Sequence, residues 1–145
     1  MQDVASKHAW CSGISGIAEA FAYVLNATGG LDARDRKLLV KLYEQFQHDV
    51  TALRGPTDFS LCHGLGGELL AWYRTTCLLP ELNLVENVMR EAIRLRWQLR
   101  DGDLEVRGGV RHATSSLAMM LGMSGVVIAL SLIESGQEFT DFPSF

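Results

Sequence analysis

The sequence has little that would suit a nucleic-acid or membrane partner. Its 145 residues carry a formal net charge of −4, and no cluster of lysine and arginine forms the basic patch that nucleic-acid binding needs. The longest apolar run, residues 117 to 133, is shorter than the roughly 20 residues that cross a bilayer as a helix. The first ten residues lack the apolar core of a signal peptide. We therefore expect a cytoplasmic protein with no membrane span and no nucleic-acid partner.

Cysteine is scarce, and its count is odd. Three cysteines cannot all pair, and an odd number is typical of a reducing compartment, where thiols stay available for metal binding or chemistry. A disulfide framework is therefore disfavoured. The alternation of apolar and polar residues that marks a β-strand is also missing. With 48% hydrophobic residues, the chain can fill one sizeable core, so residues 1–145 are expected to form one domain or one piece of a domain.

A small-residue motif, Gly-x-x-Gly, occurs three times, at residues 13–16, 64–67 and 122–125. The copies are separated by steps of 51 and 58 residues. Each copy opens a segment that is apolar on nearly every side: IAEAFAYVL, ELLAWYRTTCLL and VVIALSLI. Such a composition is typical of a helix that is buried on all sides. The motif therefore predicts three inner helices, and its glycines permit close helix packing.

Two amphipathic stretches, residues 31–50 and 81–100, lie between these apolar segments. Apolar residues repeat at helical spacing in each, at Leu38, Leu39, Leu42, Phe46 and Val50 in the first, and at Val85, Val88, Met89, Ala92, Leu95 and Leu99 in the second. Asp32, after the Gly29-Gly30 break, is expected to cap the first stretch. Pairs of one buried and one half-exposed helix, repeating every 50 to 60 residues, predict an all-α fold of five helices that stack on their neighbours.

Two cysteines and a histidine are the candidate metal ligands. Cys11 and Cys62 each stand just before a Gly-x-x-Gly motif, and His63 follows Cys62 directly. If equivalent helix starts converge, two thiolates and one imidazole meet there, and such a Cys₂His set leaves one position of a tetrahedral zinc site open. A Cys-His pair in a helical protein can also belong to the core, and this spacing fits no compact zinc finger. The residues alone leave both readings open.

The motifs resemble those of the lanthionine synthetase C-like (LanC-like) cyclase family. Residues 10–17, WCSGISGI, are similar to its W-C-x-G-x-x-G-I signature, residues 61–67 to its C-H-G-x-x-G signature, and residues 121–126 to its L-G-x-x-G segment. The resemblance implies that Cys11, Cys62 and His63 bind Zn²⁺. It also implies an α/α toroid of inner and outer helices.

The resemblance is to part of that domain. The family's toroid has seven helix pairs, whereas three inner and two outer helices correspond to its C-terminal third or slightly more. Nothing in this chain matches the upstream histidine and acidic residue of the family, so no acid or base is carried over. His112, ahead of the third inner helix, is a candidate to reach the central cavity, with a solvated loop histidine as the alternative. His8 and His48 are expected at the surface, and Cys77 as a small core residue.

The activity that the resemblance implies is zinc-dependent addition of a peptide cysteine thiol to dehydroalanine or dehydrobutyrine, which closes a thioether ring. Two alternatives stay open: a related transferase that adds glutathione to dehydrated residues, and a zinc- or peptide-binding subunit without catalysis. The expected partners are a dehydrated precursor peptide and either a protein that supplies the missing repeats or a second copy of this chain. A natural short protein, a subunit and a fragment are equally compatible with the sequence.

Overall fold

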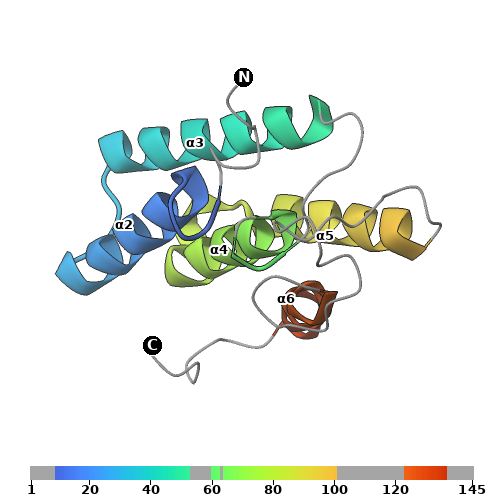
Figure 1. Ribbon diagram of the computed structural model, residues 1–145. Coiled ribbons are helices and arrows are strands. Elements are labelled where there is room, and N and C mark those ends of the chain that lie inside the picture. Colours follow the sequence, from blue (N-terminus) through green and yellow to red (C-terminus); the bar gives the residue numbers. More distant parts are fainter. Residues whose placement is uncertain (1–8, 53–59, 63, 101–122, 137–145) are drawn as a thin grey trace.

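The structure, a computed structural model, describes residues 9–52, 60–62, 64–100 and 123–136, and these residues are almost entirely helical (Figure 1). The elements in chain order are α2 (Ile14–Thr28), α3 (Ala33–Ala52), α4 (Leu65–Leu78), the short 3₁₀ helix η1 (Pro80–Leu82), α5 (Val85–Arg100) and α6 (Met123–Ser135). Within these ranges there is no strand, and no helix is both long and apolar enough to cross a membrane. The predicted all-α fold is confirmed.

Helix α4 lies at the centre of the fold. It packs against α2 on one side and α6 on the other, while α3 packs against α2, and α5 against α4 and α6 (Figure 1). The three helices that follow the Gly-x-x-Gly motifs thus form an inner layer, and the two amphipathic helices lie outside it. This is the predicted arrangement of three inner and two outer helices.

The helix boundaries follow from local sequence. Helices α2 and α4 each begin one residue after the first glycine of their motif, at Ile14 and Leu65. The backbone N–H of Asp35 donates to Asp32 Oδ1 over 2.7 Å, which confirms the predicted cap of α3. Helix α2 ends at Thr28, directly before the predicted Gly29-Gly30 break, and the φ of 116° at its cap residue Gly29 suits glycine.

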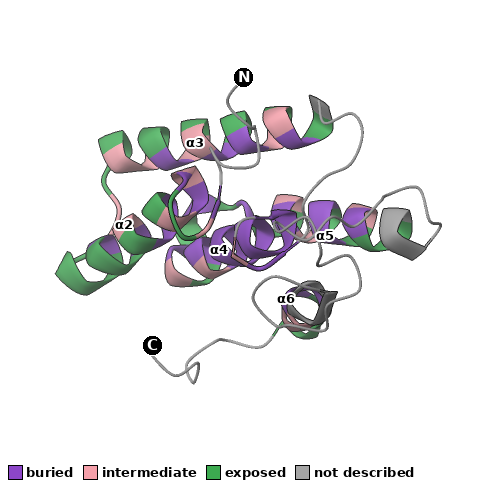
Figure 2. Ribbon diagram, viewed as in Figure 1, coloured by how far each residue is buried: buried purple, intermediate pink, exposed green. Residues whose placement is uncertain are grey.

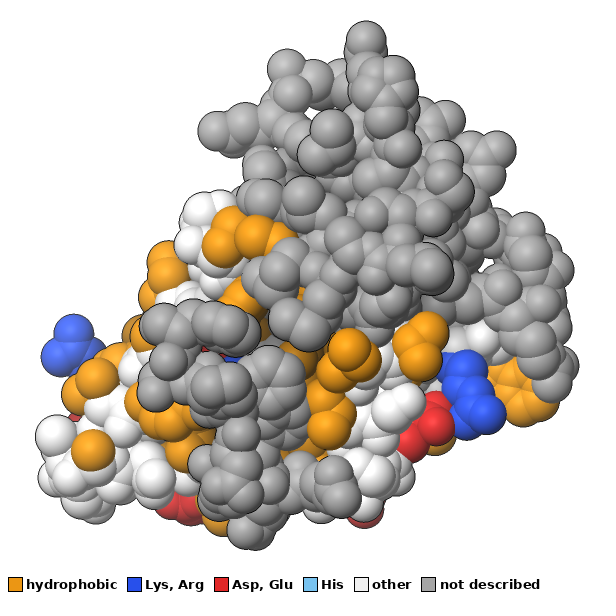
Figure 3. Space-filling view, turned by 60° about the horizontal axis from the view of Figure 1, so that its bottom comes forward, with side chains coloured by type: hydrophobic (Ala, Val, Ile, Leu, Met, Phe, Trp, Pro, Cys, Tyr) orange, Lys and Arg blue, Asp and Glu red, His pale blue; other side chains and the backbone are white. Residues whose placement is uncertain are grey.

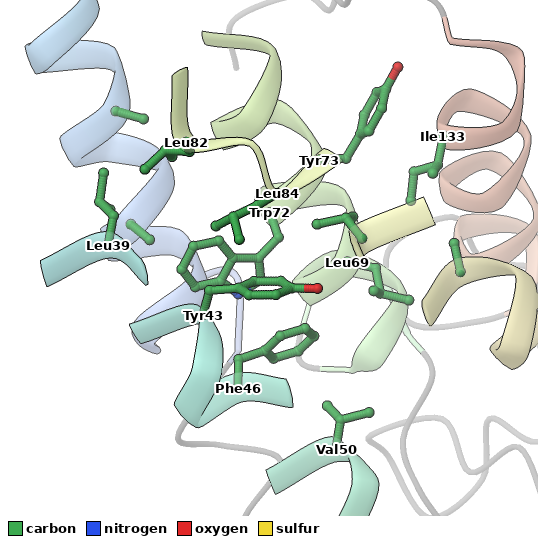
Figure 4. Packing of buried hydrophobic residues seen from close by; sticks show 14 of the residues in the cluster. Leu39, Tyr43, Phe46, Val50, Leu69, Trp72, Tyr73, Leu82, Leu84 and Ile133 are labelled. Carbon is green, nitrogen blue, oxygen red and sulfur yellow. The ribbon is translucent and has the colours of Figure 1, made fainter. Parts of the chain in front are cut away.

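An aromatic cluster fills the space between α3 and α4 (Figure 4). Trp72 meets Tyr43 edge to face, with ring centroids 5.2 Å apart, and Phe46 lies 6.0 Å from Tyr43. The three side chains are fully buried, and such pairs add to the stabilisation that burial alone provides. The other members of the predicted apolar stripes whose burial is described are buried or half-buried, but Leu38 and Val85 are exposed; the side chain of Leu99 lies outside the described residues.

The inner helices differ in how far they are buried (Figure 2). Helix α4 is buried continuously from Leu65 to Tyr73, as predicted. The same prediction is wrong for α2, where Ile17 is 63% and Val24 56% exposed, and for α6, where Val127 is 57% exposed. The reason is position: α4 has an inner helix on either side, whereas α2 packs against α4 alone in the inner layer. All-round burial therefore depends on a neighbour that the described chain supplies only to α4.

Candidate metal centre

The two cysteine-bearing turns have the same backbone structure. In the first, the N–H of Gly13 donates to the carbonyl of Ala9 over 2.7 Å; in the second, the N–H of Gly64 donates to the carbonyl of Ser60 over 3.1 Å. Both glycines are extended and precede the first residue of a helix. The described residues of the second turn thus correspond to those 51 positions earlier in the first, so the repeat seen in the sequence is also a structural repeat.

The second glycine of each motif lets the turn fold onto the helix that follows it. A Cβ atom on Gly16 would lie 1.8 Å from the carbonyl oxygen of Trp10, and one on Gly67 would lie 1.7 Å from that of Leu61. No real Cβ tolerates such distances. The close approach that these glycines permit is therefore between the turn and its own helix, which is more specific than the helix packing expected from the sequence.

The two turns meet at their cysteines. The backbone N–H of Cys11 donates to the carbonyl oxygen of Cys62 over 3.4 Å, so residues 51 positions apart are direct neighbours. Cys11 is exposed and Cys62 is half-buried. The Sγ of Cys11 lies 3.7 Å from the hydroxyl of Ser12. The structure therefore brings together the backbones of two of the three predicted ligands.

The remaining candidate residues differ in their outcome. His63, His112 and His8 lie outside the described residues, so their predicted roles stay predictions. His48 is a surface residue as predicted, 77% exposed in its side chain. Cys77 is exposed, so its assignment to the core is wrong: it lies one residue before the end of α4, where the helix turns this side chain to solvent.

A polar network joins the Cys11 turn to both inner helices. The indole N–H of Trp10 donates to Glu19 Oε2 over 2.8 Å, and Glu19 Oε1 pairs with Arg74 Nε at 3.0 Å. Arg74 also donates to the hydroxyl of Tyr23 over 2.6 Å and lies above its ring. Burial raises the pKa of Glu19, while Arg74 and Trp10 act in the opposite direction. Sequence reasoning missed this network, whose only signal was the presence of charged residues inside two apolar segments.

The donor set fits zinc. Thiolates and imidazoles are the usual ligands of Zn²⁺, and the backbones of two cysteines, one exposed and one half-buried, are adjacent here. Among the residues that the structure describes, no group of three His, Cys, Asp or Glu side chains gathers at a common point. The third candidate ligand, His63, directly follows Cys62 in the chain. The chemistry of the candidate ligands is therefore compatible with zinc, and their role as ligands stays a prediction.

Comparison with known proteins gives one match. The family model described as lanthionine synthetase C-like protein matches residues 2–145, which include both cysteine turns. The searches of curated proteins and of solved structures found no match. The matched region spans nearly the whole sequence, and the helices it contains form the inner and outer layers described above. The chain belongs to the lanthionine synthetase C-like family.

Proposed function

We propose that this chain is the zinc-binding part of a lanthipeptide cyclase, which adds a peptide cysteine thiol to dehydroalanine or dehydrobutyrine and so closes a thioether ring. Membership of the family supports a cyclase or thiol-transferase type of function. The observation that carries the proposal is the direct contact between Cys11 and Cys62. This backbone contact between two cysteines supports a shared metal site, in a chain whose motifs resemble those of the family.

Cys11, Cys62 and His63 would hold the metal. Three protein ligands leave zinc a further position for a substrate sulfur, which is the pattern of catalytic zinc sites. When bound, zinc would lower the pKa of the substrate thiol, ordinarily about 8.5, so that the thiolate predominates at neutral pH. The exposure of Cys11 leaves the site open to a peptide.

The reaction is an addition without oxidation or reduction. The substrate sulfur forms a bond to the β-carbon of the dehydrated residue, the carbon–carbon double bond becomes single, and the proton lost by the thiol is balanced by one gained at the α-carbon. No redox cofactor is required. The motif-bearing residues supply metal ligands, and none of them is assigned as the donor of the α-carbon proton.

A dehydrated peptide with one cysteine and one dehydroalanine tests the activity. Ring closure leaves the peptide mass unchanged and removes a thiol that reacts with N-ethylmaleimide. We expect the zinc-loaded chain, in its associated form, to consume the thiol faster than the chelator-treated chain or the Cys11→Ala variant does. Equal rates in all three samples would contradict the proposal.

The same assay separates the two alternatives. With glutathione present, a transferase would give a peptide heavier by one glutathione, whereas a cyclase would give unlabelled peptide of unchanged mass. A binding subunit without catalysis would retain zinc and leave the thiol reactive. Family membership fits either enzyme. The mass of the product therefore decides which thiol, intramolecular or external, the site uses.

We further propose that the exposed side of α2 is covered in the working protein, by a second copy or by a protein with matching helical repeats. Ile17 and Val24 lie about two turns apart on the same side of α2, and each is more than half exposed, although apolar inner helices usually have neighbours on both sides. In the space-filling view, hydrophobic side chains gather at the α2 end of the fold (Figure 3). The peptide substrate and this partner are both inferred from the family and the exposed surface.

Light scattering tests the association. We expect the chain alone to self-associate, or to form a complex when the partner is added, and Ile17→Glu with Val24→Glu to abolish it because the charges would be buried in the contact. Val85→Glu, on the exposed side of the outer helix α5, is the matched control and should have no effect. A monodisperse monomer with full cyclase activity would contradict this proposal.

A further inference from the structure

We propose that Trp10, Glu19 and Arg74 form a positioning network that holds the thiol of Cys11 in register with that of Cys62. None of the three is a candidate ligand or reacts with substrate. Their effect on zinc binding rests on the proposed function, whereas their effect on the distance between the two thiols is a property of the chain without metal.

The first link fixes the Cys11 turn to its own helix. Trp10 directly precedes Cys11, and its indole N–H reaches Glu19, nine residues further on, over 2.8 Å. The Glu19 side chain is 6% exposed, so the bond is shielded from competing water. Because a charge-assisted hydrogen bond has a preferred direction, it restrains where the backbone of the turn can lie.

The second link runs between two structural units. The first unit is the Cys11 turn with α2, and the second is the Cys62 turn with α4. Arg74 belongs to α4, the helix that follows the Cys62 turn, yet its Nε pairs with Glu19 on α2 at 3.0 Å. Its Nη2 donates to the hydroxyl of Tyr23, the residue 51 positions earlier, which is its structural counterpart in the first unit. Both helices that begin at a cysteine turn are therefore tied to the same carboxylate.

The second unit shows that packing alone does not require this network. The counterparts of Trp10 and Glu19, 51 positions further on, are Leu61 and Leu70. Both leucines are buried, and they form a small apolar cluster with Ala129 of α6. The fold thus fills the equivalent place with leucine, without having to desolvate a carboxylate.

A buried ion pair seldom stabilises a fold more than well-packed apolar residues do, because desolvation offsets most of the attraction. What it adds is a defined geometry, and specifying register is its best-attested role. In the first unit the ion pair lies close in sequence to the Cys11 turn and joins α2 to α4. The packing of these two helices brings the two cysteine turns together. Positioning of the thiol pair is therefore the function that we assign to the network.

The test measures how readily the two thiols meet in the metal-free chain. In a Cys77→Ser background, oxidised glutathione converts the Cys11 and Cys62 thiols to a disulfide and is itself reduced to two glutathione molecules. The equilibrium gives the effective concentration of one thiol at the other. The backbone contact is compatible with the Cα separation of roughly 4.4–6.8 Å that a disulfide requires.

We expect Trp10→Phe, which removes only the N–H donor, to lower this effective concentration about fivefold to tenfold, as loosened intramolecular geometry does. The double substitution Trp10→Leu with Glu19→Leu copies the second unit, so it should keep the thermal midpoint close to that of the parent and lower the effective concentration at least as much. Glu19→Gln still accepts the indole hydrogen bond, so its effective concentration should lie between those of the parent and of Trp10→Phe. Zinc affinity, measured by competition with a chelator, should drop by roughly tenfold in the Trp10→Phe chain, in line with the loss of a residue that orients a ligand.

Leu70→Val is the matched control, because it loosens packing at the corresponding place of the second unit. It should lower the thermal midpoint and leave the effective concentration unchanged. The proposal would be overturned by an unchanged effective concentration in both Trp10→Phe and the double variant, or by a fall that follows the thermal midpoint in every variant, Leu70→Val included. If the chain binds no zinc, the proposed function fails, while the disulfide equilibrium still tests the network.

Discussion

Alanine in place of Gly16 or Gly67 is expected to lower the free energy of unfolding by about 3 kcal/mol or more, in the range that marks severe steric conflict. The added Cβ would lie 1.8 Å or 1.7 Å from a carbonyl oxygen of the preceding turn. Because the obstacle is backbone, no side-chain movement relieves it. The turn that carries Cys11 or Cys62 would have to detach from its helix. Urea unfolding, followed by circular dichroism, measures the change.

Gly29→Ala is the control for this prediction. Position 29 also favours glycine, because its φ is +116°, but no atom lies within 4 Å of an added Cβ. Backbone strain alone should cost about 1–2 kcal/mol. A loss for Gly16→Ala no larger than that for Gly29→Ala would show that the turns do not pack against their helices as described.

Removing any one zinc ligand is expected to have the second large effect. Cys11→Ala, Cys62→Ala and His63→Ala should each weaken zinc binding by more than about a hundredfold. Loss of a residue that only orients a ligand weakens binding by up to about a hundredfold, and loss of the ligand itself should cost more. The two cysteines are adjacent through their backbones, so either substitution leaves at most one thiolate at the site. Metal analysis after dialysis against a weak chelator gives the zinc content.

Cys77→Ala is the matched control, because Cys77 is exposed on the last turn of α4 and belongs to neither motif turn. It should bind zinc as the parent chain does. Full zinc retention in any two of the three ligand variants would exclude the proposed site, whatever the behaviour of the control.

The helices were predictable because their signals are local. Apolar residues at helical spacing define α3 and α5, and the glycine motif gives the first residue of α2 and of α4. The exposure of α2 was not predictable, since Ile17 and Val24 look the same in the sequence as the buried residues of α4. Whether an apolar residue is covered depends on a neighbouring helix, and periodicity within one helix carries no information about that neighbour.

The contact between Cys11 and Cys62 followed from the repeat, because equivalent positions of adjacent units tend to converge. The Glu19–Arg74 pair did not follow from it. Its members stand 55 residues apart at positions that are not equivalent, and their counterparts are apolar or aromatic. A charged residue in an apolar segment indicates that a partner exists, but only the packing of α2 against α4 identifies which one.

Zinc K-edge X-ray absorption on the purified, zinc-loaded chain tests the central claim most directly, because it reports the atoms bound to the metal. The account predicts about one zinc per chain, with two sulfur ligands at about 2.3 Å and a nitrogen at about 2.0–2.1 Å. The sulfur signal should vanish in a chain that combines Cys11→Ala with Cys62→Ala, and persist in Cys77→Ala. A spectrum without sulfur in the parent chain, or one that the double substitution leaves unchanged, would contradict the account.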